Sequence, residues 1–314
     1  MIGVEPRLGG PVSGSEIPPV DYLSWYVPRL QEQRPYDLSQ SGFGYDWGVE
    51  ADIDTMLTFW KSGQDPRQWV ADRYGVELDQ VCIAHGACQS ISLAILAALP
   101  EDGPRAVGVE MPSFAVVSQS ARLLGCEVIP FHRGPNEGPW KLNREQVLEI
   151  LPKVGVLALT PVMNPTGEMI SEDDQKWLIE VTQEAGVNIV SDEVYLDAAK
   201  GTEFYRPMYK IANNSISINS LTKTYGLGPI RFGWMIGDPD LILNAKRPSK
   251  ICRVWPVHQP FQSPSRYFQD WMKHWKGFGK HANTIYPNWS RYCSRTEFNG
   301  RRHHLESMEH SQLG

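Results

Sequence analysis

Short apolar runs alternate with stretches of helical spacing through the middle of the chain, and this alternation constrains the fold more than any other feature. Six runs rich in branched aliphatic residues have the character of strands covered on both faces. They are Val81–Ala84, Ala106–Val109, Val154–Thr160, Val187–Ser191, Ser215–Asn219 and Phe232–Gly237. The stretches with helical spacing between them are Gln89–Leu99, Val116–Leu124, Arg144–Leu151 and Glu172–Ala185. The pattern predicts an α/β fold with a mostly parallel sheet.

Length and charge narrow the class of protein. The 314 residues suffice for one large domain and a smaller part, and the net charge of −6 argues against nucleic acid or an anionic membrane as partner. No apolar run approaches the ~20 residues of a membrane span. Residues 1–15 lack the pattern of a secretory signal. The five cysteines form no CxxC pair, so we expect reduced thiols, no zinc site and a cytoplasmic protein.

The two ends of the chain differ from its middle. Prolines interrupt residues 1–44, where only Tyr22–Gln31 has the character of a helix. We expect this segment to be an arm that packs on the large domain, residues 45–247, or on a neighbouring subunit. The stretch Arg247–Gly314 contains six Ile, Leu and Val and carries a net charge of +7. These aliphatics are too few for a second core, so we expect 248–314 to be an atypical basic tail that folds poorly.

The loop after the first strand candidate has the composition of a phosphate-binding turn. It reads His85-Gly86-Ala87-Cys88 and leads into an Ala- and Leu-rich stretch. Small residues at a helix start let backbone N–H groups approach a phosphate, whose charge the helix dipole favours. A plain helix N-terminus is the alternative. GxGxxG and GxxxxGK[ST] patterns are missing, so a dinucleotide or nucleoside triphosphate site is not indicated.

The next two loops contain an aromatic residue and an amide. Phe114 follows Ala106–Val109 after a proline turn, and its ring either packs in the core or covers a flat cofactor. Asn164-Pro-Thr-Gly167 follows Val154–Thr160. This sequence is typical of a tight turn, and it can also direct the Asn164 amide to a phenolate oxygen.

A carboxylate and a phenol follow the fourth strand candidate. Asp192 and Tyr195 come directly after Val187–Ser191. A carboxylate at the end of a buried strand is costly unless it is paired, and a protonated pyridine nitrogen is a suitable partner. Tyr195 can then reach the hydroxyl of the same ring. The alternative is that Asp192 caps a helix.

The run after Ser215–Asn219 holds a lysine among hydroxyls and an arginine. Ser220 lies three residues before Lys223, and Arg231 lies eight residues after it. Such a lysine is suited to form an imine with an aldehyde cofactor whose phosphate the hydroxyls and Arg231 hold. An exposed loop lysine is the alternative. Because ligands bind at the carboxyl ends of strands in open α/β sheets, we expect these loops to converge on one site.

These motifs together resemble a known family. Asn164-Pro-Thr-Gly167, Asp192-x-x-Tyr195, Ser220-x-x-Lys223 and Arg231 occur in the order and spacing of the fold-type I pyridoxal-phosphate-dependent aminotransferases, in the aspartate aminotransferase-like class I/II group. The resemblance covers roughly Asp65–Arg247. It implies pyridoxal 5'-phosphate as cofactor, an amino acid and a 2-oxo acid as substrates, and a homodimer.

The resemblance also implies a role for each matching residue. Lys223 looks like the lysine of the internal aldimine and the carrier of the 1,3-proton shift, and Asp192 like the partner that keeps the pyridine nitrogen protonated. Asn164 and Tyr195 look like donors to the phenolic oxygen, and Phe114 like the ring that stacks on the cofactor. The residues that would surround the phosphate are Gly86, Ala87, Cys88, Ser220 and Arg231.

Other functions remain open on the sequence alone. A carbon–sulfur β-lyase, a cyclising synthase or a decarboxylase would use the same lysine and cofactor. An inactive remnant that binds the cofactor and an interaction module with a basic tail belong to other classes, and the missing glycine fingerprint disfavours a Rossmann dehydrogenase. Family members continue into a small domain with an arginine for the substrate carboxylate. Residues 248–314 do not resemble that domain, so we expect it to be incomplete and transamination to be weak or absent.

Overall fold

A computed structural model of the chain describes residues 19–29, 41–42, 62–134, 140–199 and 207–252. All of them lie in the compact unit Met1–Pro260. Within these described ranges, no helix is long and apolar enough to cross a membrane. Cys82, Cys88 and Cys126, which lie in these ranges, are free of disulfides.

Eight strands form one sheet, in the order β1-β8-β7-β6-β5-β2-β3-β4. Their bounds are β1 Val81–Ala84, β2 Ala106–Met111, β3 Glu127–Gly134, β4 Lys141–Leu142, β5 Val156–Leu159, β6 Asn188–Asp192, β7 Ser215–Ser220 and β8 Gly233–Gly237. The pairs β2–β3, β2–β5, β5–β6 and β6–β7 are parallel, whereas β1–β8, β7–β8 and β3–β4 are antiparallel. The predicted α/β fold with a mostly parallel sheet is confirmed.

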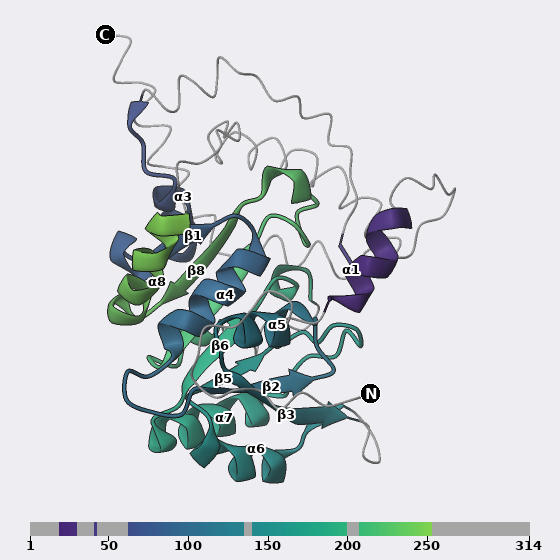
Figure 1. The fold of residues 1–314 in the computed structure, drawn as a ribbon. Coiled ribbons are helices and arrows are strands. Elements are labelled where there is room, and N and C mark those ends of the chain that lie inside the picture. Colours follow the sequence, from purple (N-terminus) through teal and green to yellow (C-terminus); the bar gives the residue numbers. More distant parts are fainter. Residues whose placement is uncertain (1–18, 30–40, 43–61, 135–139, 200–206, 253–314) are drawn as a thin grey trace. The chain divides into compact units, whose positions relative to one another are not determined.

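Helices cover both faces of the sheet (Figure 1). The α-helices are α1 Asp21–Tyr26, α3 Arg67–Tyr74, α4 Ala87–Ala98, α5 Val116–Leu123, α6 Arg144–Ile150, α7 Glu172–Ala185 and α8 Pro239–Cys252. The 3-10 helices are η2 Val27–Arg29, η3 Leu78–Gln80, η4 Leu151–Lys153, η5 Leu196–Ala198, η6 Met208–Lys210 and η7 Gly228–Ile230. Helices α4, α5 and α8 pack on one face of the sheet, and α6 and α7 lie on the other.

Coverage of both faces explains why the central strand β5 is a continuous apolar run. In β5, Val156 and Ala158 belong to the core on the α4 side, while Leu157 and Leu159 belong to the core on the α7 side. Successive side chains of a strand point to opposite faces, so both sets must be apolar.

The predicted strands and the four central helices match the observed ones to within two residues at each end. Strand β3 was not predicted, because Pro130, His132 and Arg133 interrupt its apolar residues and only the two-residue β4 lies beyond it. Helices α3 and α8 were not predicted either. Helix α8 continues to Cys252, past the predicted domain boundary at residue 247.

Strand β8 runs opposite to its neighbour β7, and this reversal matters for the site. Ser220 at the end of β7 pairs with Gly233 at the start of β8. The residue Arg231, which precedes β8, therefore returns to the sheet edge where Lys223 follows β7. The division of the chain into an arm, residues 45–247 and a tail stays a prediction, and residues 253–314 lie outside the described ranges.

Candidate functional site

The loops at one edge of the sheet bring the predicted residues together. Asp192 ends β6, Lys223 follows β7, and Cys88 lies in the first turn of α4. Desolvation raises the pKa of the Cys88 thiol; the positive charges of Arg231 and Lys223 oppose this rise, and Asp192 adds to it. Three separate segments of the chain, which hold Cys88, Asp192, and Lys223 with Arg231, therefore meet at this edge.

Lys223 is a half-buried lysine with a lowered pKa. Its Nζ donates a hydrogen bond to Ser41 Oγ at 2.8 Å. Burial lowers the pKa of the amine, and the neighbouring Cys88 and Asp192 oppose this effect. A lowered pKa increases the fraction of neutral amine, which is the form that attacks a carbonyl group.

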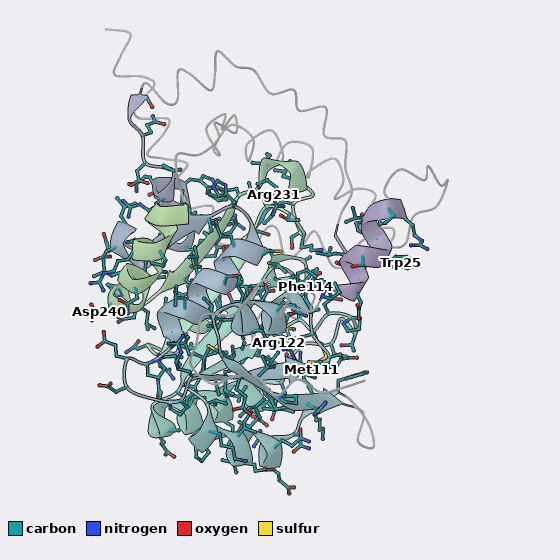
Figure 2. All side chains as sticks on the ribbon, in the orientation of Figure 1. Trp25, Met111, Phe114, Arg122, Arg231 and Asp240 are labelled. Atoms are coloured by element: carbon teal, nitrogen blue, oxygen red, sulfur yellow. The ribbon has the colours of Figure 1, made fainter. Side chains whose placement is uncertain are left out.

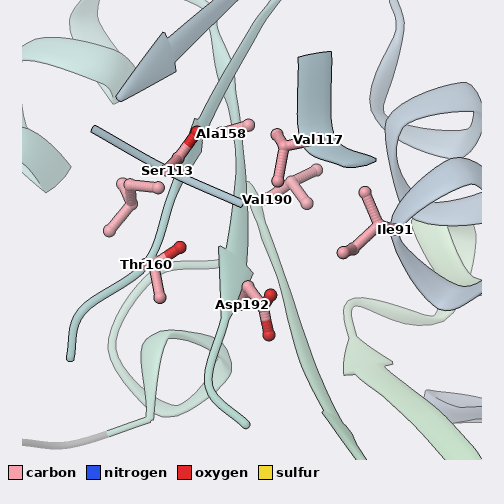
Figure 3. Close-up of a pocket in the computed structure, with 8 residues that line it drawn as sticks. Ile91, Ser113, Val117, Ala158, Thr160, Val190 and Asp192 are labelled. Atoms are coloured by element: carbon pink, nitrogen blue, oxygen red, sulfur yellow. The ribbon is translucent and has the colours of Figure 1, made fainter. Parts of the chain in front are cut away.

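Asp192 is a buried carboxylate with an exposed fraction of 7%. Burial raises its pKa to about 6, while the N–H of Val194, at 3.4 Å from Oδ1, and the charge of Lys223 oppose the rise. A cavity of about 10 Å³ adjoins the carboxylate, and its lining includes Ser113 and Thr160 (Figure 3). This volume holds roughly one water molecule. A cation or proton donor against Asp192 would stabilise its ionised form.

Asn164 and Tyr195 are joined directly. Asn164 Nδ2 donates to Tyr195 Oη at 3.3 Å, and Tyr195 Oη donates to Ser41 Oγ at 2.9 Å. The tight turn that holds Asn164 closes through the N–H of Gly167, which donates to the Met163 carbonyl at 2.7 Å. Gly167 has φ +75°, a conformation that disfavours other residues. The turn and the amide contact therefore occur together.

A buried ion pair positions the strand end before this turn. Arg133 Nε lies 3.2 Å from Glu110 Oε1, and both side chains are 1% exposed. Arg133 donates to the carbonyls of Thr160 and Pro161, and the N–H of Thr160 donates to Glu110 Oε2 at 3.0 Å. Burial raises the pKa of Glu110, and Arg133 opposes this rise. The pair holds the backbone that leads to Asn164, and it was not predicted from the sequence.

Gly86 and Arg231 form a cradle at the start of α4. Gly86 precedes the helix with φ 80°, and a Cβ built on it would lie 2.5 Å from Arg231 Nη2. The guanidinium donates to the carbonyls of His85 and Gly228, both at 3.2 Å. The N–H groups of Ala87 and the next residues have no acceptor within the helix. Backbone donors, helix dipole and guanidinium together suit a phosphate.

Two further predicted residues lie at this edge without a direct contact that establishes their roles. Ser220 is fully buried at the end of β7, and its Oγ accepts from the N–H of Thr222 at 3.3 Å. Phe114 lies before α5, where its carbonyl accepts from the N–H of Val117 (Figure 2). Phosphate binding by Ser220 and ring stacking by Phe114 stay predictions.

A polar cluster supports the two loops that carry Tyr195 and Lys223. Tyr225 Oη donates to Asp197 Oδ2 at 2.5 Å, and Asn219 Nδ2 donates to the same oxygen at 3.2 Å. Arg73 Nη2 from α3 donates to the Tyr225 hydroxyl and lies 3.5 Å from Asp197 Oδ2. No sequence pattern predicted this cluster, although Asp197 and Tyr225 each come two residues after a predicted site residue.

Ser41 and Gly42 were also missed, because they lie in the predicted N-terminal arm. A Cβ on Gly42 would lie 3.2 Å from Lys223 Cδ. No periodicity or motif in the sequence relates this segment to the lysine. In the described parts of the chain, no group of three or more His, Cys, Asp or Glu is arranged to hold a metal ion. The histidines His303, His304 and His310 lie outside those parts.

Comparisons with known proteins agree with this geometry. The family model for aminotransferase class I and II matches residues 63–254, more than half of the chain. A histidinol-phosphate aminotransferase from Blochmanniella pennsylvanica is 26% identical over 188 residues, which cover 59% of this chain and 49% of that protein. The chain spans about half the length of the curated relatives it matches.

Solved structures share the fold. An aspartate aminotransferase from Thermus thermophilus with maleate has a TM-score of 0.66 at 19% identity, over 82% of this chain and 71% of that one. A PLP-dependent aminotransferase from Streptococcus suis also has a TM-score of 0.66, at 18% identity, over 87% of this chain and 77% of that one. At these identities the match concerns the architecture.

Proposed function

The chain belongs to the class I and II aminotransferase family, and from this premise we propose that it moves an amino group between an amino acid and a 2-oxo acid. Members of this family use pyridoxal phosphate. The observation that carries the proposal is the half-buried amine of Lys223, which shares one sheet edge with Asp192 and with the cradle of Gly86 and Arg231.

The donor set of the cradle suits the phosphate of this cofactor. The backbone N–H groups of Ala87 and Cys88 open α4, and Arg231 supplies a cation beside Gly86. A side chain at position 86 would fill the space against the guanidinium. Ser220 is proposed as a further phosphate ligand, since it ends the strand from which the lysine loop departs.

The buried carboxylate of Asp192 suits the opposite end of the cofactor. With a pKa of about 6 in this environment, it gains from a cationic N–H partner. The pyridine nitrogen is such a partner, and Asn164 and Tyr195 are proposed to face the phenolic oxygen of the ring. Phe114 is proposed to cover the ring face.

The bound cofactor supplies an aldehyde that condenses with amines and a ring that accepts electrons from the substrate α-carbon. The side chains of the chain bind, orient and move protons. Lys223 Nζ would hold the cofactor covalently and, once released, would carry a proton between the substrate α-carbon and the cofactor carbon. Asp192 would keep the ring nitrogen protonated, and its fixed carboxylate would preorganise the site for the charge that develops during the reaction.

Assembly and location are part of the proposal. We expect a homodimer of a cytoplasmic protein whose Cys82, Cys88 and Cys126 stay reduced. Light scattering on the purified protein measures the mass, and a mass of one chain at all concentrations would contradict the dimer.

Covalent trapping tests the function. The purified protein is incubated with pyridoxal phosphate, reduced with borohydride and digested for peptide mapping. We expect the pyridoxyl group on Lys223 and its loss in Lys223→Ala. Lys246 is the matched control, because burial also lowers its pKa but its Nζ donates to the carbonyls of Leu78 and Asp79. Lys246→Arg should keep the label on Lys223.

Turnover is measured by transfer of ¹⁵N from an amino acid to a 2-oxo acid, with several pairs of substrates. Transfer in the wild type and none in Lys223→Ala supports the proposal. Label on Lys223 without transfer for any pair indicates a protein that binds the cofactor but is not a transaminase.

A further inference from the structure

The hydroxyl of Ser41 lies between two central groups of the candidate site. Its Oγ accepts hydrogen bonds from Lys223 Nζ at 2.8 Å and from Tyr195 Oη at 2.9 Å. Asn164 Nδ2 donates in turn to Tyr195 Oη. The separations along the chain are 182 residues for Lys223 and 154 for Tyr195. One serine from the N-terminal segment thus joins the lysine loop to the loop after β6.

The neighbouring glycine shows that this contact depends on close backbone packing. A Cβ on Gly42 would lie 3.2 Å from Lys223 Cδ, 3.3 Å from its Cα and 3.4 Å from its carbonyl oxygen. The first two distances are shorter than ordinary van der Waals contacts. The backbone of Ser41-Gly42 can therefore lie against the lysine because position 42 has no side chain.

We propose that Ser41 is a positioning residue that holds the Lys223 amine beside the Tyr195 hydroxyl and so sets the direction from which the amine reaches the cofactor. Its catalytic meaning rests on the proposed function, while the contact itself does not. A lysine side chain has high rotational freedom, and an acceptor at 2.8 Å selects the rotamers that bring Nζ to Tyr195.

Three ionisable groups in the described part of the chain surround the Lys223 amine besides Ser41. Cys88 from α4 and Asp192 from β6 raise the pKa of Lys223. The Tyr195 hydroxyl donates to the same Ser41 oxygen as the amine. All three remain when only the serine hydroxyl is removed. A hydrogen bond to Ser41 favours the ammonium form, so its loss should make Lys223 easier to deprotonate.

The first experiment uses the cofactor-free protein. Trinitrobenzenesulfonate labels lysines at a series of pH values, and peptide mass mapping follows Lys223 and, as an internal control, Lys246. In Ser41→Ala we expect the labelling profile of Lys223 to move down by about half a pH unit, equivalent to roughly threefold faster labelling at a fixed lower pH. The profile of Lys246 should not move. Ser41→Thr, which keeps the hydroxyl, should restore the wild-type profile of Lys223.

A second readout uses the holoenzyme. Ser41→Ala should lower kcat for ¹⁵N transfer severalfold and leave the affinity for pyridoxal phosphate within twofold, because no phosphate ligand is touched. An unchanged Lys223 profile in Ser41→Ala overturns the proposal. A shifted profile in a protein that never takes the pyridoxyl label refutes the proposed function and leaves the Ser41 contact established.

Discussion

The Tyr225 hydroxyl donates to the Asp197 carboxylate at 2.5 Å, and this bond joins the loop of Lys223 to the loop of Tyr195. Tyr225 is 2% exposed, and burial raises the pKa of its hydroxyl well above the usual value. The two residues lie 28 positions apart on segments that follow adjacent parallel strands. The bond therefore fixes the distance between the two loops that carry Lys223 and Tyr195.

Tyr225→Phe should destabilise the protein and loosen the lysine loop. The variant leaves the Asp197 carboxylate and Arg73 without the hydroxyl that now joins them, at an expected cost of about 1–3 kcal/mol in unfolding free energy. Urea denaturation measures the cost. Tyr209→Phe is the control, since its hydroxyl donates a longer bond, to the Tyr74 carbonyl at 3.3 Å. Equal stability of Tyr225→Phe and the wild type would contradict a supporting role.

Breaking the buried pair between Glu110 and Arg133 should be among the most damaging single changes. Arg133→Met leaves an uncompensated carboxylate and frees the carbonyls of Thr160 and Pro161. We expect a loss of about 3–5 kcal/mol for the single variant, and a smaller combined loss for Glu110→Gln with Arg133→Met than the sum of the two. Strict additivity in denaturation experiments would show that the pair does not interact.

Glu193 should make stability depend on pH. Burial raises its pKa to about 7 from a reference value of 4.5. The folded protein then retains a proton that the unfolded chain releases, so the unfolding free energy falls as pH rises from about 4.5 to 7 and is flat above. In Glu193→Gln, the fall in unfolding free energy over this pH range should be smaller by at least about 1 kcal/mol. Asp192, with its pKa of about 6, leaves a residual slope at the lower end of the range.

The glutamine variant is a close match, because one oxygen of Glu193 accepts from the hydroxyls of Ser191 and Ser217 and from the N–H of Met208. A glutamine oxygen can accept the same three bonds. Identical pH profiles of stability for the variant and the wild type would show that Glu193 does not titrate in this range.

Arg231 should strengthen binding of the cofactor's phosphate and have no effect on binding of its pyridine ring. It has φ 54°, a left-handed conformation that is strained for arginine. Arg231→Gly removes the cation and also the strain, so the fold should persist while affinity for pyridoxal phosphate falls by about 10- to 100-fold. Binding of pyridoxal, which lacks the phosphate, should be unchanged in equilibrium titrations. Equal losses for both ligands would remove Arg231 from the phosphate site.

Asp192→Ala should separate cofactor attachment from turnover. Lys223 remains, so borohydride should still fix the pyridoxyl group there. The ring loses the charge partner that Asp192 is proposed to provide, and we expect the rate of ¹⁵N transfer to fall by an amount on the order of several kcal/mol of barrier. Unchanged transfer in an otherwise active protein would leave Asp192 with a structural role only.

Local patterns predicted much of the fold. The strands β5 and β6 were predictable because both of their faces are covered, which makes apolar residues necessary on both sides whatever the partner strand is. Strand β3 was not, because Pro130, His132 and Arg133 break that run. Asp192 ends β6, and Asn164 and Lys223 lie in the turns that follow β5 and β7, so the parallel topology brings all three to one edge of the sheet.

Tertiary structure decided the contacts that complete this edge. Ser41 meets Lys223 across 182 residues, and Arg73 reaches Tyr225 across 152. Glu110 and Arg133 pair because β2 and β3 run side by side. The sequence determined where the strands end and which groups follow them, since hydrophobic periodicity and turn residues act over a few positions. Contacts between distant segments depend on how whole helices and strands pack. No local pattern in a single sequence predicts them.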